Sequence, residues 1–82
     1  MAATATREEI EGRVFTALEE FGAEPDQINP DATFESLDID SLDLVELAQV
    51  VEDEYGVEVS DAEMDRIKTV QDVVDFVTER QQ

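Results

Sequence analysis

The sequence predicts an all-α protein: a small four-helix bundle of three longer helices and one short third helix, with a long loop between helices one and two. Three observations favour this fold. Apolar residues recur at helical spacing in three segments, capping residues precede each helix, and no two segments alternate like paired strands. Because 82 residues are at the low end of independently folding chains, we expect residues 1–82 to form a single domain, with residues 1–5 as a flexible tail.

The first helix is expected to start directly after Thr6. Thr6 and Glu9 have the spacing of a capping box, in which each side chain accepts a hydrogen bond from the other residue's backbone N–H. Gly22 is a typical stop at the C-terminal end. The apolar residues between these two signals recur at helical spacing and are Ile10, Val14, Ala17, Leu18 and Phe21.

Residues 23–39 are expected to form a long ordered loop. Pro25 and Pro30 prevent the first helix from continuing through this segment. Three apolar residues are spaced along the loop so that they can anchor it to a core, namely Ile28, Phe34 and Leu37. Loops of this length are uncommon in compact domains and often carry function.

The second helix is predicted to run from Ser41 to about Tyr55. Asp40 supplies the N-cap oxygen, Asp43 places a carboxylate in the first turn, and Gly56 ends the helix. At about 100° per residue, one arc of this helix is apolar and is expected to face the core. Its members are Leu44, Leu47, Ala48, Val51 and Tyr55.

Two further helices are predicted near the C-terminus. Ser60 and Glu63 form a second capping box, and only a turn or two separates them from Ile67, so the third helix is short. Thr69 caps the fourth helix, whose stripe leaves Phe76 off its centre. The stripe consists of Val70, Val73, Val74 and Val77.

The composition excludes several classes of function. Five Lys and Arg against 23 Asp and Glu leave a formal net charge of −18 at pH 7, which argues against nucleic-acid binding. The absence of Cys and His excludes disulfides, Cys/His zinc sites, thiol nucleophiles and Ser-His triads. No stretch approaches the roughly 20 apolar residues of a membrane span, and the start of the chain lacks the pattern of a signal peptide. A cytoplasmic location is therefore expected.

The middle of the chain is continuously acidic. Between Val14 and Asp65 the sequence has 17 acidic residues and no Lys or Arg. A solvated surface is the simplest interpretation of such a segment. However, Leu42 and Val45 point away from the core arc and lie among these carboxylates, which indicates a docking face for basic partners. The docking face is predicted to comprise Leu42, Asp43, Val45, Glu46, Gln49, Glu52 and Asp53.

Ser41 opens the second helix within this acidic segment. A serine at such a position is by itself far more often a capping or solvent residue than a reactive one. It cannot act as a catalytic nucleophile by itself, because the chain has no His and an aspartate is too weak a base near pH 7. Its hydroxyl is suited to modification, since a helix N-terminus favours a phosphate. No catalytic residue is predicted, and the chain is not expected to be an enzyme.

The start and body of the second helix resemble the acyl carrier proteins of dissociated fatty-acid and polyketide synthases. The resemblance rests on Asp40-Ser41-Leu42, on Asp43-Leu44-Val45-Glu46-Leu47 and on Glu52-Asp53-Glu54-Tyr55-Gly56, and it extends from about Pro30 to Val77. It implies that Ser41, flanked by Asp40 and Leu42, carries 4′-phosphopantetheine transferred from coenzyme A. Acyl groups would then be held as thioesters on the terminal thiol of that arm.

The resemblance also implies the partners and the handling of the acyl chain. The partners are a phosphopantetheinyl transferase, an acyltransferase, a ketosynthase and other synthase enzymes with basic docking surfaces, all meeting the second helix of a monomer. The bundle is expected to open for an alkyl chain, since each buried methylene contributes about 0.8 kcal/mol. Larger residues at Val51 or Val74 are expected to oppose this sheltering.

Three positions depart from the commonest pattern of fatty-acid carriers. Asp38-Ile39 replaces a segment that often has glycine, Gln49 replaces a frequent apolar contact, and Ser60 replaces a frequent proline. Fatty-acid biosynthesis remains the preferred pathway, with a polyketide or other specialised pathway, including D-alanyl carriers, as the alternative. Peptidyl carrier domains more often have Gly and His before the serine, so Asp40 disfavours them.

An acidic adaptor or divalent-cation-binding protein is the alternative from a different class. Asp38, Asp40 and Asp43 lie close together in the sequence. A calcium loop of the EF-hand type starting at Asp38 would nevertheless require ligands where the chain has Leu42 and Gln49, so no metal site is predicted. Ser41→Ala separates the two classes, because an adaptor keeps its function and a carrier loses it.

Overall fold

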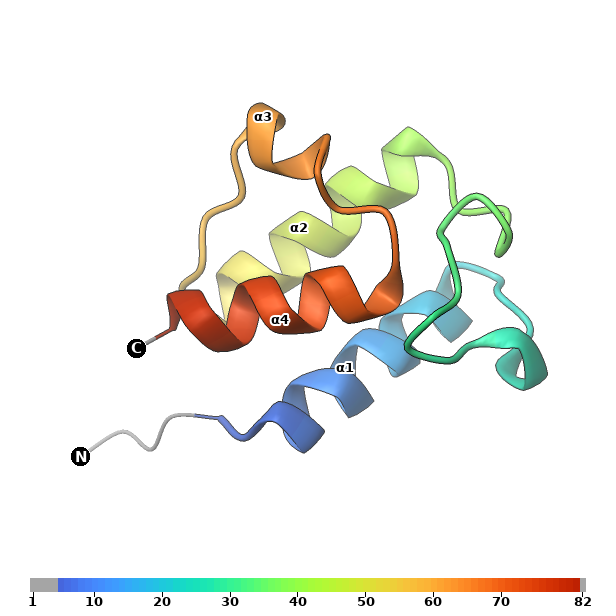
Figure 1. Ribbon diagram of the computed structural model, residues 1–82, viewed down its shortest axis with the longest axis horizontal. Coiled ribbons are helices and arrows are strands. Elements are labelled where there is room, and N and C mark those ends of the chain that lie inside the picture. The colour runs from blue at the N-terminus through green and yellow to red at the C-terminus, as the bar shows by residue number, and fades with distance from the viewer. Residues whose placement is uncertain (1–4, 82) are drawn as a thin grey trace.

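The computed structural model describes residues 5–81 and is a bundle of helices (Figure 1). The elements are α1 (Arg7–Glu20), a short 3-10 helix η1 (Pro25–Gln27), α2 (Ser41–Tyr55), α3 (Asp61–Met64) and α4 (Val70–Arg80). Extended pairing within this part of the chain is limited to one isolated bridge between Thr33 and Thr69. The predicted all-α fold with a short third helix and a long first loop is therefore confirmed.

The predicted flexible tail of residues 1–5 falls mainly outside the described residues, which begin at Ala5. The backbone oxygen of Ala5 accepts a hydrogen bond from the side-chain amide of Gln81 at 2.6 Å. This bond joins the segment before α1 to the residue that follows α4. Ala5 also packs against the core cluster, whereas residues 1–4 of the predicted tail lie outside the described residues.

Each helix begins where the capping residues place it. Complete capping boxes are present at Thr6 for α1, at Ser60 for α3 and at Thr69 for α4. At the start of α2, the Asp40 carboxylate accepts a hydrogen bond from the Asp43 N–H at 3.0 Å. Gly56 ends α2 with φ of 70°, a left-handed conformation that suits glycine. These local signals explain why the helix boundaries follow from sequence.

The tightest part of the core lies between α1 and α4, which run side by side in Figure 1. Both helices contribute side chains with almost no exposed surface, because their apolar stripes face each other. These residues are Ile10, Val14, Ala17 and Leu18 from α1 and Val70, Val74 and Val77 from α4. From α2, Leu47 and Val51 complete this core.

Only part of the predicted core arc of α2 is buried. Leu47 and Val51 are buried, whereas Leu44, Ala48 and Tyr55 remain half-exposed. The predicted arc does face the inside of the bundle. However, part of it is covered only by α3. Because α3 is only one turn long, it cannot bury the whole arc.

The loop before α2 is ordered and anchored, as predicted. Ile28, Phe34 and Leu37 are all buried, and so is Ile39, which the sequence patterns did not single out as a core residue. The loop backbone also bonds to the segment that starts α4. The Phe34 N–H donates to the Lys68 carbonyl at 3.1 Å, and the Val70 N–H donates to the Ala32 carbonyl at 3.0 Å. These contacts hold the entry to α2 in a defined position.

Candidate functional site

Ser41 is the first residue of α2, and its side chain is exposed. Asp40 performs the capping, so the Ser41 hydroxyl is not needed to close the helix end. Among residues 5–81 it has no hydrogen-bond partner, unlike the hydroxyls of Ser36 and Ser60. Ser36 Oγ donates to the Thr33 carbonyl at 2.8 Å, and Ser60 Oγ accepts from the Glu63 N–H at 3.2 Å. Of the three serines, Ser41 thus presents the free hydroxyl.

The surroundings of Ser41 fit a phosphate-linked group. The hydroxyl lies at the open N-terminal end of a helix of 15 residues, where free backbone N–H groups and the dipole favour negative charge. The exposed position leaves room for a bulky substituent. The neighbouring Asp40 and Asp43 carboxylates oppose an added negative charge, but Asp40 is turned to the Asp43 N–H by its capping bond.

Asp38 has an unusual backbone conformation three residues before Ser41. Its φ is 60°, in the left-handed region that glycine adopts freely and that aspartate tolerates better than most residues. The turn lets Ile39 enter the core while Asp40 reaches the helix end. Asp38 occupies the segment where the resembling carriers often have glycine, and the positive φ is a physical reason for that preference.

The predicted docking face is exposed along one side of α2. Leu42 is 75% exposed and Val45 is 45% exposed, and within the described part of the chain these two are the exposed large hydrophobic residues. Glu46, Gln49, Glu52 and Asp53 are also exposed, whereas Asp43 is half-buried. Folding leaves this apolar and acidic combination facing solvent. Its role in docking stays a prediction.

The carboxylates of the docking face are not neutralised from within the bundle. In residues 5–81, the ion pair that α2 makes is between Glu54 and Arg13 of α1. Glu54 lies outside the docking face, so the charges of Glu46, Glu52 and Asp53 remain available to a partner. Such a surface attracts cations over the distance set by salt screening, about 10 Å at moderate ionic strength.

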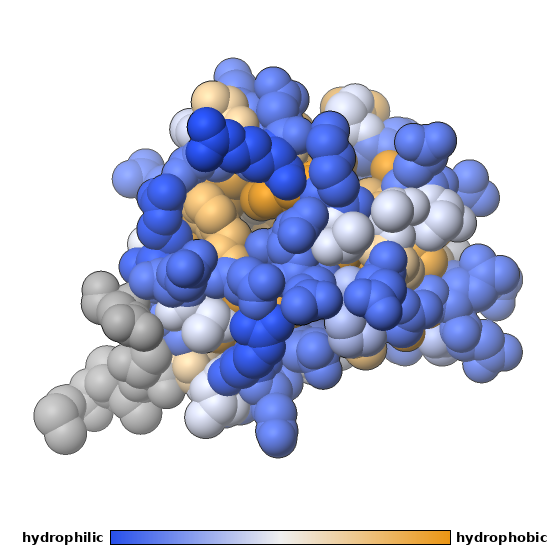
Figure 2. All heavy atoms as spheres, in the orientation of Figure 1, coloured by the Kyte–Doolittle hydropathy of each residue, from blue (hydrophilic) through white to orange (hydrophobic). Residues whose placement is uncertain are grey.

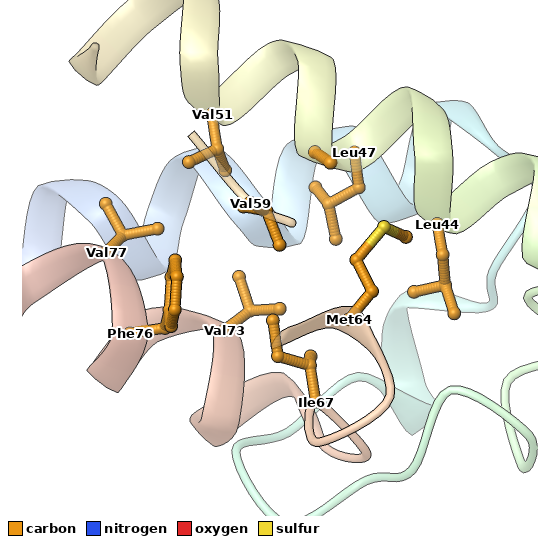
Figure 3. A pocket seen from close by; sticks show the side chains of 10 residues that line it. Leu44, Leu47, Val51, Val59, Met64, Ile67, Val73, Phe76 and Val77 are labelled. Carbon is orange, nitrogen blue, oxygen red and sulfur yellow. The ribbon is translucent and has the colours of Figure 1, made fainter. Parts of the chain in front are cut away.

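A small apolar pocket lies between α2, α3 and α4 (Figure 3). Its cavity volume is about 20 Å³, enough for roughly one water molecule. Figure 2 shows hydrophobic atoms in the area framed by these helices, surrounded by hydrophilic side chains. The pocket is lined by Leu44, Leu47, Ala48, Val51, Val59, Met64, Ile67, Val73, Phe76 and Val77.

The pocket begins close to Ser41 along the chain. Leu44 lies three residues after Ser41, less than one helical turn, and Figure 3 shows Leu44 and Val77 at opposite ends of the lining side chains. Of the two positions expected to influence sheltering, Val51 lines this pocket. Val74 is fully buried in the core and is not among the lining residues, so its influence on sheltering stays a prediction.

Sequence patterns did not assign Met64, Ile67 or Phe76 to a site, although all three line the pocket. The one available signal was the position of Phe76 off the centre of the stripe on α4. A bulky aromatic residue beside a valine stripe indicates a second apolar contact region on the same helix. Recognising it required knowing that α3 faces that side.

The comparisons with known proteins agree with this geometry. Residues 15–77 match the family described as "Phosphopantetheine attachment site". The acyl carrier protein of Thermosynechococcus vestitus is 44% identical over 63 residues, covering 76% of this chain and 78% of the relative. The chain belongs to the acyl carrier protein family.

Two further relatives extend the match over more of the chain. The meromycolate extension acyl carrier protein of Mycolicibacterium smegmatis is 43% identical over 75 residues, covering 89% of this chain and 76% of the relative. A solved structure of acyl carrier protein from Enterococcus faecalis has a TM-score of 0.79 and 31% identity, covering 93% of this chain and 99% of that chain. The shared fold thus includes α1 to α4.

Membership in the acyl carrier protein family identifies the kind of function. The chain is a carrier in fatty-acid or related synthesis, 4′-phosphopantetheine is its covalent prosthetic group, and it interacts with synthase enzymes. Acyl carrier proteins have no catalytic activity of their own. In residues 5–81, no helix is long and apolar enough to cross a membrane, and no cluster of three or more acidic residues is arranged to hold a metal ion.

Proposed function

We propose that Ser41 carries 4′-phosphopantetheine and that acyl groups are delivered from this arm to the enzymes of fatty-acid biosynthesis. The observation that carries the proposal is the exposed Ser41 hydroxyl at the first residue of α2. It makes no hydrogen bond to residues 5–81. The chain contains no cysteine, so the thiol that forms the thioester has to come from the prosthetic group. Asp40 and Leu42 flank the attachment point.

The attachment requires chemistry that a partner enzyme supplies. The Ser41 oxygen forms a bond to a phosphate of coenzyme A as the nucleotide part leaves, and the hydroxyl proton passes to a base. The chain has no His, and its carboxylates are weak bases near neutral pH. A phosphopantetheinyl transferase therefore provides the base, and this chain provides the positioned acceptor.

The decisive experiment is intact mass before and after incubation with coenzyme A and a phosphopantetheinyl transferase. The wild-type chain is expected to gain the mass of one 4′-phosphopantetheine, and peptide mapping is expected to locate it at Ser41. Ser41→Ala should gain none, with an unchanged circular dichroism spectrum. Ser36→Ala is the matched control, because Ser36 is also exposed and lies five residues earlier, and it should load normally. Loading of Ser41→Ala would refute the assignment.

We further propose that the docking face receives the partner enzymes, including an acyltransferase and a ketosynthase. Leu42 and Val45 provide apolar contacts, while the acidic residues steer basic surfaces toward Ser41. Glu46→Lys is expected to raise the KM of the transferase at least several-fold without changing the melting temperature. Glu19→Lys is the matched control, since Glu19 is also exposed but lies on α1. If Glu46→Lys and Glu19→Lys raise the KM equally, the effect comes from the net charge of the protein and not from the docking face.

The apolar pocket is proposed to shelter the acyl chain. Its lining is apolar and starts near Ser41, but its volume of about 20 Å³ has to increase before an alkyl chain enters. Val51→Phe is expected to block this expansion and expose long thioesters to hydrolysis, while short thioesters remain unaffected. Equal hydrolysis rates for long thioesters on the wild type and on Val51→Phe would contradict sheltering.

A polyketide or other specialised pathway is the alternative within the family. It is favoured by Gln49, an exposed polar residue on the docking face where fatty-acid carriers often have an apolar contact. If the fatty-acid pathway is the correct one, Gln49→Met should improve turnover by a fatty-acid ketosynthase only slightly. A large gain would point to the alternative pathway. The cytoplasmic location and the monomeric state stay predictions.

A further inference from the structure

Two cationic residues in the segment between α3 and α4 are not used inside the bundle. Five of the 82 residues are Lys or Arg, and the formal net charge is −18. Three of the five form ion pairs: Arg7 with Asp75, Arg13 with Glu54 and Arg80 with Glu63. Arg66 and Lys68 are exposed and form no ion pair within residues 5–81. These two residues are called the cationic patch below.

Backbone hydrogen bonds hold the cationic patch in a defined place. The Arg66 N–H donates to the Glu63 carbonyl at 3.1 Å. The Lys68 N–H donates to the Asp72 carboxylate at 3.0 Å, and the Lys68 carbonyl accepts from the Phe34 N–H at 3.1 Å. Side chains on a fixed backbone lose less conformational entropy when they bind a partner. The two charges are therefore suited to a specific contact.

The cationic patch lies at the end of the bundle where α2 begins (Figure 1). The loop residue that donates to the Lys68 carbonyl also accepts a hydrogen bond from the Ile39 N–H at 2.9 Å, two residues before Ser41. Ile67, between the two cations, lines the apolar pocket together with Leu44, three residues after Ser41. The patch thus borders the start of α2 on the pocket side of this helix, and the docking face lies on its other, exposed side.

Opposite charges beside the acidic docking face restrict how an enzyme can be oriented on it. A basic surface is attracted along the whole docking face, so this attraction alone does not fix the rotation of the enzyme. A basic group over the cationic patch is repelled, and an acidic group in the same place is attracted. Two surfaces of opposite sign therefore favour one orientation over the others.

Among the proposed partners, the phosphopantetheinyl transferase has the strictest demand on its orientation. It has to bring its active site to the Ser41 hydroxyl itself, whereas enzymes that act later meet the thiol at the end of the arm. The transferase must therefore cover the start of α2, which the docking face and the cationic patch border.

We propose that the cationic patch pairs with acidic side chains of the phosphopantetheinyl transferase and fixes its orientation over Ser41. The docking face attracts the basic surface of the enzyme, and Arg66 and Lys68 set its rotation. This inference rests on the proposed loading of Ser41 and adds to it a contact of the opposite charge.

Steady-state kinetics of loading test the contact, with the carrier as the varied substrate and coenzyme A at saturation. Arg66→Gln and Lys68→Gln are each expected to raise the KM for the carrier about two- to fivefold and to leave kcat unchanged, as for the loss of one exposed ion pair. Both changes make the chain more negative. If net charge alone determined binding, a basic enzyme would bind both variants more tightly and the KM would fall. The sign of the change separates the two explanations.

Two control variants accompany these measurements. Arg7→Gln removes the same charge from α1, where Arg7 pairs with Asp75, and it should not raise the KM. Lys68→Arg keeps the charge and should retain the wild-type KM. The circular dichroism spectra of the patch variants should match that of the wild type, since neither Arg66 nor Lys68 forms an ion pair within residues 5–81.

Lys68 is the only lysine of the sequence, which allows a direct test of the contact. A water-soluble carbodiimide joins an amine to a carboxylate without a spacer, so it links the two groups of an ion pair. In a mixture of the unmodified chain and the transferase, mass spectrometry after digestion is expected to find Lys68 joined to an Asp or Glu of the transferase. Links from docking-face carboxylates to lysines of the transferase are the internal control. Docking-face links without a Lys68 link would contradict the proposal.

The kinetic outcomes distinguish the proposal from its alternatives. A KM for the carrier that is unchanged or lower in both patch variants would overturn it and leave the loading of Ser41 intact. An increase in the KM for coenzyme A instead would mean that the cations meet the phosphates of coenzyme A, which also overturns it. An equal increase in Arg7→Gln would have the same consequence. If the wild-type chain is not loaded at Ser41, the proposed function fails and this proposal fails with it.

Discussion

The α1–α4 interface and the α3 side of the bundle differ in how completely they are buried. Between α1 and α4, side chains such as Ile10, Leu18 and Val74 have no exposed surface. In α3 no residue is buried, and the pocket beside it has a cavity volume of about 20 Å³. The two regions thus differ in packing, although Val77 belongs to both, since it is buried in the core and also lines the pocket. We therefore expect changes on the α3 side to cost less stability than changes in the α1–α4 interface.

The largest predicted effect is on the free energy of unfolding, when one large side chain is shortened to alanine in the α1–α4 interface and another on the α3 side. Leu18→Ala removes a fully buried side chain and is expected to lower the free energy of unfolding by about 2–5 kcal/mol. Met64→Ala removes a half-buried side chain and should cost about 1 kcal/mol. Urea denaturation monitored by circular dichroism measures both. Similar costs at the two positions would remove the distinction between the regions.

A smaller effect is expected at the turn that leads into α2. Asp38 has φ of 60°, so alanine at this position should be less stable than glycine by about 1 kcal/mol. Asp38→Ala and Asp38→Gly remove the same charge, so their difference isolates the backbone conformation. Thermal unfolding of the two variants gives the comparison. If they melt together, the left-handed backbone conformation at Asp38 does not disfavour alanine.

Screening the net charge of −18 is expected to stabilise the whole bundle. Raising NaCl from low to moderate concentration, or adding magnesium, should increase the melting temperature by several degrees, equivalent to about 1 kcal/mol. Differential scanning calorimetry measures the shift, with a neutral solute as control. The effect should remain in Leu18→Ala, because it arises from surface carboxylates rather than from the buried interface. A melting temperature independent of salt would contradict it.

The smallest predicted effect is a gain in α1. Gly12 lies in the middle of this helix and is exposed, and a methyl group added at its Cα would meet no atom within 4 Å. Gly12→Ala should therefore raise the free energy of unfolding by about 0.5–1 kcal/mol, through higher helix propensity. Amide exchange at Met64 and Ile67 is expected to stay the same. Slower exchange at these probes would mean that α1 and α3 are coupled more closely than their burial indicates.

The helix boundaries and the candidate attachment site were accessible from sequence because their signals are local. Thr6 with Glu9, Ser60 with Glu63, and Asp40 with Asp43 satisfy backbone groups only three residues away. Ser41 could be selected because it directly follows such a cap. Its exposure and that of Leu42 and Val45 follow from helical periodicity, which is also a local property.

The pocket was not accessible in the same way. Met64, Ile67 and Phe76 meet only because α3 and α4 fold over α2, and no short-range pattern specifies that meeting. Val74 illustrates the same point. Its position on the apolar stripe indicated burial correctly, but periodicity does not show whether a buried valine also lines a pocket.

The amino-acid sequence alone indicated four capped helices, a strongly acidic chain and a serine at the start of α2, because each depends on neighbouring residues or on composition. The arrangement of helices in space established which apolar side chains are fully buried, which line a pocket, and how Glu63 reaches Arg80 across 17 positions of the chain. Such contacts depend on long-range packing, in which residues distant in sequence compete for the same buried volume. That competition is resolved only when the whole bundle has formed.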